Sequence, residues 1–247
     1  MKKLFTLTIA LGALLISGNA FAQEEEKSTM FNGSTNIQVF YDFGSDRKNV
    51  TTTLEGFYQD PWGDTFFFID YDFNAKKDAT PGSYGSYMEI SRGINFWQNT
   101  ALAPISAHVE LNAGVNFHNI NWLFGLNWFV HSKNFKNTFT FELMYKTFKG
   151  SSSDLPMQFT FVWGLKDLFG AKGLTFSGFA DIWGENGYLG SANDRFVFLS
   201  EPQLWYSVGQ FFGCKNLNIG GEVELSCNFA GVHGFMCRPC AGVKWVF

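Results

Sequence analysis

The feature that most constrains this chain is the alternation of apolar and polar residues over Thr51–Phe73. Successive side chains of a β-strand point to opposite faces of the sheet. In the second half of the stretch, one face is wholly apolar and the other combines aromatic rings with carboxylates. Residues 59–64, a short Pro/Gly turn, separate the two halves and indicate a hairpin. An apolar outer face around a polar interior is typical of a transmembrane barrel.

The same alternation recurs along the chain, and no helical period competes with it. We expect about twelve strands, each of roughly the 9–11 residues that a tilted membrane strand needs. The sequence therefore predicts an all-β protein, a transmembrane antiparallel β-barrel. The expected strands are Thr35–Phe43, Val50–Tyr58, Thr65–Phe73, Tyr84–Phe96, Ile105–Phe117, Ile120–Val130, Thr138–Phe148, Met157–Leu165, Leu174–Trp183, Arg195–Val208, Leu217–Phe229 and Phe235–Phe247.

The N-terminus has the composition of a secretory signal. Lys2 and Lys3 precede an apolar run, and a small-residue site ends at Ala22. The apolar run is shorter than the roughly 20 residues that a membrane-spanning helix needs. We therefore expect a signal peptide at 1–22, a mobile segment at 23–34 and a single barrel at 35–247.

The C-terminal strand ends in an apolar parity that finishes at Phe247. This ending resembles the signal by which the barrel-assembly machinery recognises outer-membrane barrels. Together with the signal peptide, it predicts the outer membrane of a Gram-negative bacterium, with membrane lipid around the barrel. The formal net charge of −4 argues against nucleic acid as a partner. A soluble periplasmic β-sandwich or a lipocalin-like barrel is the alternative fold.

The polar parity of each strand predicts the lining of the lumen. Two interpretations of this lining are open. In one, charges cross-link a closed interior, as in small barrels filled by side chains. In the other, carboxylates repel anions and aromatic faces offer stacking sites for flat rings. The predicted lining comprises the acidic and imidazole groups Asp42, Glu55, Asp70, Asp72, Glu89, His108, Glu110, Glu142, Asp181, Glu201, Glu222 and Glu224, the basic groups Lys146, Lys166, Arg195, Arg238 and Lys244, and the aromatic groups Phe40, Phe57, Phe66, Phe68, Phe179 and Trp205.

Four cysteines in an exported chain allow up to two disulfides. If the last hairpin turns about Val232, Cys227 lies opposite Cys237 with the same parity, so this pair is the disulfide candidate. Cys214 and Cys240 have no assigned partner. No residue cluster supports a metal site or a cofactor.

Three stretches carry a resemblance to a known family. They are the hairpin Thr51–Phe73, the segment Ser86–Trp97 (SYMEISRGINFW) and the segment Ser200–Tyr206 (SEPQLWY). This pattern resembles the Tsx-like, or OmpK-like, nucleoside-channel family of twelve-stranded outer-membrane barrels, of which the chain looks like a divergent member. The cysteines and the Asn/Phe-rich middle depart from that family's pattern, which puts the substrate in doubt more than the fold.

The resemblance implies facilitated diffusion of small solutes, nucleosides above all, through a narrow acidic and aromatic lumen. Aromatic rings would stack on the base, and carboxylates would accept hydrogen bonds from ribose hydroxyls. The resemblance also implies that the protein is not an enzyme. The substrate-binding candidates are Glu55, Phe57, Phe66, Phe68, Asp70, Asp72, Glu89, Arg92 and Glu201; by parity, Arg92 alone of these falls on the lipid face.

Two other classes of function remain open. A closed structural or interaction barrel would use its outer loops as a surface receptor. An outer-membrane lipid hydrolase would need a Ser–His pair at the outer rim, for which His118 and His233 are the candidate histidines.

Overall fold

A computed structural model of the chain describes residues 32–74, 82–115, 120–148, 152–186 and 195–247. The expected signal peptide, the expected mobile segment up to residue 31, and His118 lie outside these residues. Among the described residues, no helix is long and apolar enough to cross a membrane.

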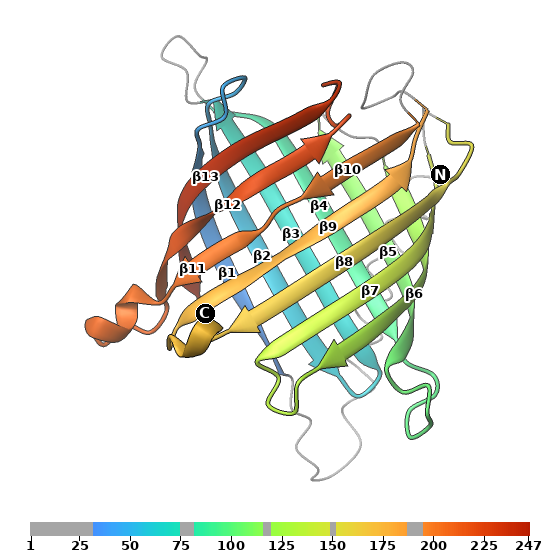
Figure 1. Cartoon of the computed structure of the whole chain (residues 1–247), viewed down its shortest axis with the longest axis horizontal. Helices are drawn as coiled ribbons and strands as arrows, with labels where there is room; N and C mark the ends of the chain where they lie inside the picture. Colours follow the sequence, from blue (N-terminus) through green and yellow to red (C-terminus); the bar gives the residue numbers. More distant parts are fainter. Residues whose placement is uncertain (1–31, 75–81, 116–119, 149–151, 187–194) are drawn as a thin grey trace. The chain divides into compact units, whose positions relative to one another are not determined.

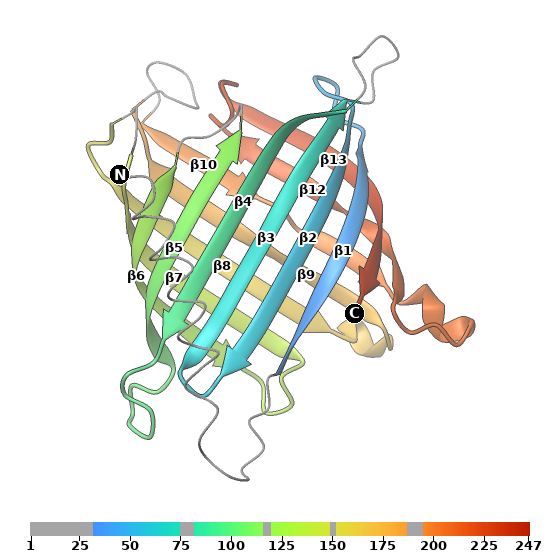
Figure 2. The same ribbon diagram turned by 180° about the vertical axis from the view of Figure 1, so that it is seen from behind.

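One antiparallel sheet contains every described strand, and it closes on itself because the first strand pairs with the last. Figure 1 shows the tilted strands on one side of the barrel, and Figure 2 shows those behind it. The strands are β1 (Asn32–Asp42), β2 (Asn49–Asp60), β3 (Gly63–Asn74), β4 (Ser83–Ile94), β5 (Ile105–Val115), β6 (Asn121–His131), β7 (Asn137–Lys146), β8 (Met157–Lys166), β9 (Leu174–Gly184), β10 (Phe196–Ser200), β11 (Gln203–Tyr206), β12 (Leu217–Cys227) and β13 (Phe235–Val246).

The strands β10 and β11 form one interrupted position in the barrel, since both pair with β9 and with β12. The sequence predicts a single strand here. The interruption falls at Glu201-Pro202, because proline has no N–H for the ladder. Opposite it, a Cβ at Gly178 would lie 2.4 Å from the carbonyl oxygen of Glu201, so a glycine is needed where the bulge approaches β9. The barrel thus has twelve strand positions, which confirms the expected antiparallel β-barrel.

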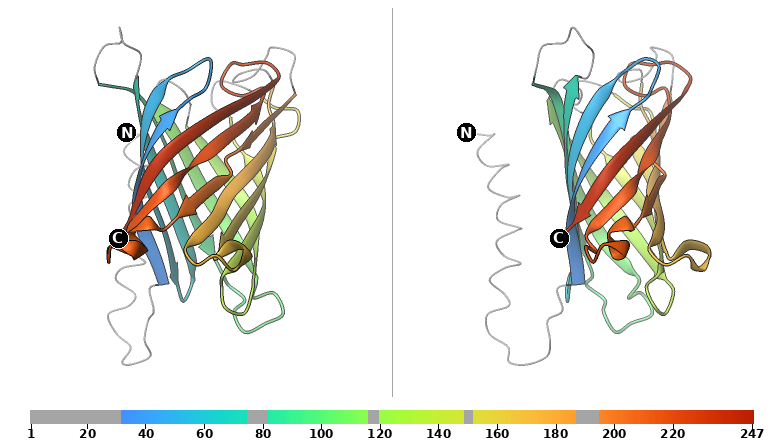
Figure 3. Two further views of the ribbon diagram at one scale, coloured as in Figure 1. Left: turned by 60° about the vertical axis from the view of Figure 1, so that its left-hand side comes forward. Right: turned by 90° about the vertical axis from the view of Figure 1, so that its left-hand side faces the viewer.

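The two ends of the barrel are named from its first and last strands, which lie side by side (Figure 3). We call the end where β1 begins and β13 ends the terminal end, and the opposite end the far end. Two short 3-10 helices, η1 (Leu168–Gly170) and η2 (Val208–Phe211), follow β8 and β11 at the terminal end (Figure 1).

The two faces of the sheet differ in polarity as the alternation predicts. The outward parity exposes large apolar side chains around the barrel, among them Val39, Leu126, Leu143 and Val243. The inward parity contains buried polar groups such as Gln38, which is 0% exposed. A soluble barrel would bury its apolar face instead.

Burial of the inward side chains changes along the barrel axis. On β7, Met144 and Lys146 near the far end are buried, whereas Thr138 near the terminal end is half-buried. On the terminal side, the inward-facing Phe57 and Val162 are 39% and 37% exposed. Side chains on these strands therefore pack more tightly in the far half of the lumen, although Ser106 and Asn127 in the terminal half are buried as well.

The last hairpin contradicts the expected disulfide between Cys227 and Cys237. In the observed register, Cys227 pairs with Phe235 and Cys237 pairs with Leu225. All four cysteines are free thiols. The turn is centred one residue earlier than Val232, which moves every partner by two residues and keeps the parity.

Candidate solute pathway in the lumen

An acidic and aromatic surface covers the inward faces of three neighbouring strands. The register pairs Thr53 with Asp70, Glu55 with Phe68 and Phe57 with Phe66, so the hairpin β2–β3 presents these side chains to the lumen. The strand β4 continues the same face, since Phe68 pairs with Glu89 and Asp70 with Tyr87. We call this surface the acidic–aromatic strip. Its members are Glu55, Phe57, Phe66, Phe68, Asp70, Asp72, Tyr87 and Glu89.

The aromatic rings of the strip contact one another. The ring centroids of Phe66 and Phe68 are 6.0 Å apart, and those of Phe68 and Tyr87 are 5.7 Å apart at an edge-to-face angle. These rings are half-buried, so part of each faces the open part of the lumen. Such rings offer a stacking surface that tolerates any flat aromatic solute.

Neutral donors hold the carboxylates of the strip in place. The hydroxyls of Thr53 and Thr51 donate to Asp70 and Asp72 over 2.5 and 2.6 Å, respectively. The amide of Asn36 donates to Glu55 over 2.8 Å. Because these donors carry no charge, the hydrogen bonds orient the carboxylates without adding a positive charge to the strip.

The opposite wall brings further carboxylates toward the strip. Glu201, between β10 and β11, and Glu222 on β12 both interact electrostatically with Asp70 on β3. The amide of Gln203 donates to Glu222 over 2.9 Å, again a neutral partner. Since β2, β1 and β13 separate β3 from β12 in the sheet, these interactions pass through the lumen.

Two aromatic side chains fill the wall beside these carboxylates. Phe40 on β1 and Trp205 on β11 have ring centroids 5.5 Å apart, although β13 and β12 lie between their strands. The intervening positions are Gly242 and Gly220, where a Cβ would lie 2.6 Å from Phe40 and 2.9 Å from Trp205. The glycines thus give the two rings room to meet. The ammonium of Lys244 lies 4.3 Å from the Trp205 ring.

At the far end, the carboxylates are paired with arginines. The guanidinium of Arg238, whose side chain is 3% exposed, pairs with Glu224 at 2.5 Å and with Asp46 in the β1–β2 loop at 2.7 Å. Arg47 in the same loop pairs with Glu224 and with Asp42. We call these five residues the far-end arginine cluster. The hydrogen bond from Arg238 lowers the pKa of the Asp46 carboxyl.

A second packed group lies on the opposite side of the far half. The ammonium of Lys146 lies 3.8 Å from the Trp183 ring and donates to Gln158 over 2.9 Å. The Trp183 indole in turn donates to Glu185 over 2.7 Å. The sequence analysis names Lys146 as lining but omits Trp183, although Trp183 shares the inward parity of Asp181. With the far-end arginine cluster, this group forms a constriction.

Not every predicted site residue lies in the lumen. The strip contains Glu55, Phe57, Phe66, Phe68, Asp70, Asp72 and Glu89, and Glu201 faces it. Arg92 does not: it shares the outward face of β4, pairs in register with Thr65 and forms an ion pair with Asp60 at 2.7 Å. Its assignment as a lumen residue is wrong because its parity on β4 is opposite to that of Glu89.

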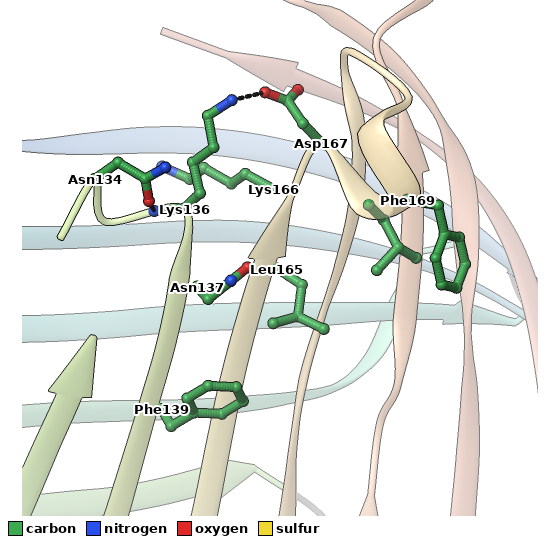
Figure 4. A pocket seen from close by; sticks show the side chains of 9 residues that line it. Asn134, Lys136, Asn137, Phe139, Leu165, Lys166, Asp167 and Phe169 are labelled. Carbon is green, nitrogen blue, oxygen red and sulfur yellow. Dashed lines mark hydrogen bonds and ion pairs between the residues drawn. The ribbon is translucent and has the colours of Figure 1, made fainter. Parts of the chain in front are cut away.

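Outside the barrel, a shallow pocket lies at the terminal end between β7 and β8 (Figure 4). An exposed ion pair between Lys136 and Asp167, with Nζ and Oδ2 2.6 Å apart, spans it. Phe139 and Leu165 contribute apolar lining. This pocket is separate from the lumen.

Residues 34–247 match a family described as "Domain of unknown function (DUF5020)". The chain belongs to this family. No curated protein matches the sequence.

Among solved structures, the chain is similar to a KdgM porin, with a TM-score of 0.50 at 12% identity over 87% of this chain and 99% of the porin. It also matches Pseudomonas aeruginosa OccK11 (OpdR), with a TM-score of 0.45 at 6% identity over 87% of this chain and 95% of that one. Acinetobacter baumannii OccAB3 matches with a TM-score of 0.40 at 8% identity over 87% and 99%. The likeness to the KdgM porin shows that this family member has a porin-type barrel fold.

Proposed function

We propose that the chain is a passive channel for small polar solutes in the outer membrane of a Gram-negative bacterium. The observation that carries the proposal is the acidic–aromatic strip, where half-buried rings lie beside carboxylates held by neutral donors. A solute-sized flat ring can stack on such a surface, and its polar edge can donate to the carboxylates. The apolar outer face supports a membrane location.

Nucleosides are the solute class that this surface fits best. Their bases have an aromatic face for Phe66 and Phe68, and their ribose hydroxyls are donors that Asp70 and Asp72 can accept. Uncharged nucleosides also avoid the repulsion that ionised carboxylates of the strip would impose on anions such as nucleotides. The proposal therefore retains the Tsx-like resemblance as its source of substrate class.

The proposed export and insertion follow from the two ends of the chain. We propose cleavage after Ala22 and recognition of the last strand by the barrel-assembly machinery through Phe247. The Phe247 side chain is 70% exposed, and its backbone N–H donates to Thr35 on β1 over 2.9 Å. Its side chain is thus accessible at the seam of the barrel.

The packed far half favours a second candidate, a closed barrel that serves as a surface receptor. Buried charges that are fully paired can cross-link an interior without a pathway. Conductance separates the two candidates. The purified protein in a planar bilayer should give small cation-selective currents that millimolar adenosine blocks and glucose does not. The absence of current at every voltage would support the closed barrel instead. The lipid hydrolase alternative depends partly on His118, which lies outside the described residues, and stays a prediction.

A further inference from the structure

A cluster of ligand-type side chains lies in the lumen wall away from the acidic–aromatic strip. His108 and Glu110 share the inward face of β5, and the imidazole Nε2 is 3.1 Å from a carboxylate oxygen of Glu110. Glu142 on β7 places a carboxylate oxygen 3.8 Å from Nδ1 of the same imidazole. One ligand atom from each residue lies within 4.8 Å of those of the other two, and all three side chains are buried.

Glycines on the neighbouring strands open the space around His108. The register row through His108 contains Gly93 on β4 and Gly125 on β6. Gly125 cannot hold a side chain, because a Cβ there would lie 2.0 Å from the carbonyl oxygen of Leu143 on β7. Gly125 pairs with Met144 on β7, and Glu142, the next inward residue of β7, reaches diagonally across β6 to within 3.8 Å of the imidazole.

The other glycine of the row makes room for a further carboxylate. A Cβ at Gly93 would lie 2.6 Å from Oδ2 of Asp64, so the Asp64 side chain lies over this glycine. Asp64 interacts electrostatically with His108. Carboxylates on β3, β5 and β7 therefore converge on a single imidazole.

The cluster leaves polar atoms without partners among the described residues. His108 is only 6% exposed. Its Nδ1 is fully buried and has no hydrogen-bond partner. Oδ1 of Asn112, two residues beyond Glu110 on the same face, is also buried and unpartnered. Leaving a buried donor or acceptor without a partner is unfavourable, and a bound ion would give Nδ1 of His108 such a partner.

We propose that His108, Glu110 and Glu142 bind a divalent transition-metal ion in the lumen wall. One imidazole and two carboxylates form a mixed nitrogen and oxygen set that suits Zn²⁺, Mn²⁺, Co²⁺ or Fe²⁺. Metal–ligand bonds of about 2.0–2.2 Å in a tetrahedral site put neighbouring ligand atoms roughly 3.3–3.6 Å apart, which is shorter than the 3.8 Å between His108 and Glu142. The ion takes one imidazole nitrogen, so the two glutamate side chains, which contact different nitrogens in this structure, rotate toward the same one. Three protein ligands leave open coordination positions.

A divalent cation would also offset the repulsion between the carboxylates of the cluster. Two carboxylates near one another in a buried wall repel, and a divalent charge between them removes that repulsion. The bound ion would join β5 to β7 across β6. Metal binding does not require conduction, so its test is independent of the test of the proposed channel.

The test is metal binding by the mature, detergent-folded barrel prepared without a histidine tag. Zn²⁺ competition with a fluorescent chelator should give one tight site per chain. His108→Gln and the near-isosteric Glu142→Gln should each weaken Zn²⁺ binding at least about tenfold. Changing a residue that only hydrogen-bonds to a metal ligand already has an effect of that size. Glu222→Gln, which removes a lumen carboxylate outside the cluster, and His131→Gln should not change Zn²⁺ binding. Retained mobility differences between heated and unheated samples on gels establish that each variant folds.

X-ray absorption at the zinc edge identifies the ligands. The proposal requires a shell of nitrogen and oxygen at about 2.0–2.1 Å and no sulfur at about 2.3 Å. A sulfur shell that disappears when the free cysteines are changed to serine would overturn it. So would Zn²⁺ affinity that is the same in wild type, His108→Gln and Glu142→Gln.

Discussion

The far-end arginine cluster allows a quantitative test of how the packed half of the lumen is stabilised. Arg238→Met removes a guanidinium that donates to Glu224, to Ser226 over 3.2 Å and to Asp46. Methionine keeps the apolar stem, so the change isolates the charge. Breaking a buried ion pair by removing one partner costs about 3–5 kcal/mol. Because Arg47 still pairs with Glu224, we expect a loss near the low end, about 3 kcal/mol.

The assay is the free energy of unfolding in urea for protein folded into lipid vesicles, followed by tryptophan fluorescence. Lys136→Met is the matched control, since it also removes a cation from an ion pair, but one at the surface (Figure 4). Exposed pairs contribute little, so its midpoint should not move measurably. The double variant Arg238→Met with Glu224→Gln should cost less than the sum of the two single changes.

An Arg238→Met midpoint as close to wild type as that of Lys136→Met would refute this reasoning. Additivity of the two single changes would refute it as well, because it would mean that the two groups do not interact in the folded barrel. Either result would remove the basis for treating the far half as a cross-linked constriction.

The other predictions concern pH and the lumen. The pKa of Asp46 in the folded protein lies below the ordinary 3.8, so the ionised carboxyl stabilises the fold above that value. This stabilisation is lost as pH falls through the folded pKa. Asp46→Asn should therefore flatten the drop in urea midpoint below about pH 4. Asp70→Asn with Glu222→Gln should lower the ratio of cation to anion permeability by about twofold or more, measured as reversal potential in a KCl gradient; an unchanged ratio would place the selectivity elsewhere. Phe66→Ala should weaken block by adenosine about five- to a hundredfold, the range of one stacking contact, whereas the outward Phe124→Ala should not.

The alternation of side chains was enough to predict the barrel and the facing of most of its residues. Parity depends only on backbone geometry, so Glu55, Phe66 and Asp70 could be assigned to one face before any pairing was known. Pro202 is the sequence feature that indicates the break between β10 and β11, because a proline within a strand pattern argues against a continuous central strand.

Register could not be predicted in the same way. Moving the last turn by one residue shifts each partner by two, and apolar side chains still face outward, so parity cannot distinguish the two registers. The actual turn is set by Asn228, which has a φ of 56° and accepts a hydrogen bond from the N–H of Gly234 over 2.9 Å. That local geometry separates Cys227 from Cys237.

The His108 cluster also required register. The sequence predicts that His108, Glu110 and Glu142 all face inward, and it gives no sign that they meet. Their contact depends on the register across β6, in which Gly125 pairs with His108 and Glu142 lies one inward position from the partner of Gly125. The sequence predicts no metal site because contacts between separate strands cannot be read from parity alone.

The most direct test of the proposed channel is single-channel recording of the mature protein in a planar bilayer, with and without millimolar adenosine. The account predicts small cation-selective openings, because the strip contains acidic side chains and no basic one. It also predicts block by adenosine but not by glucose. Openings indifferent to adenosine would contradict the assignment of the strip as a nucleoside site. The absence of any conductance from demonstrably folded protein would contradict the channel itself.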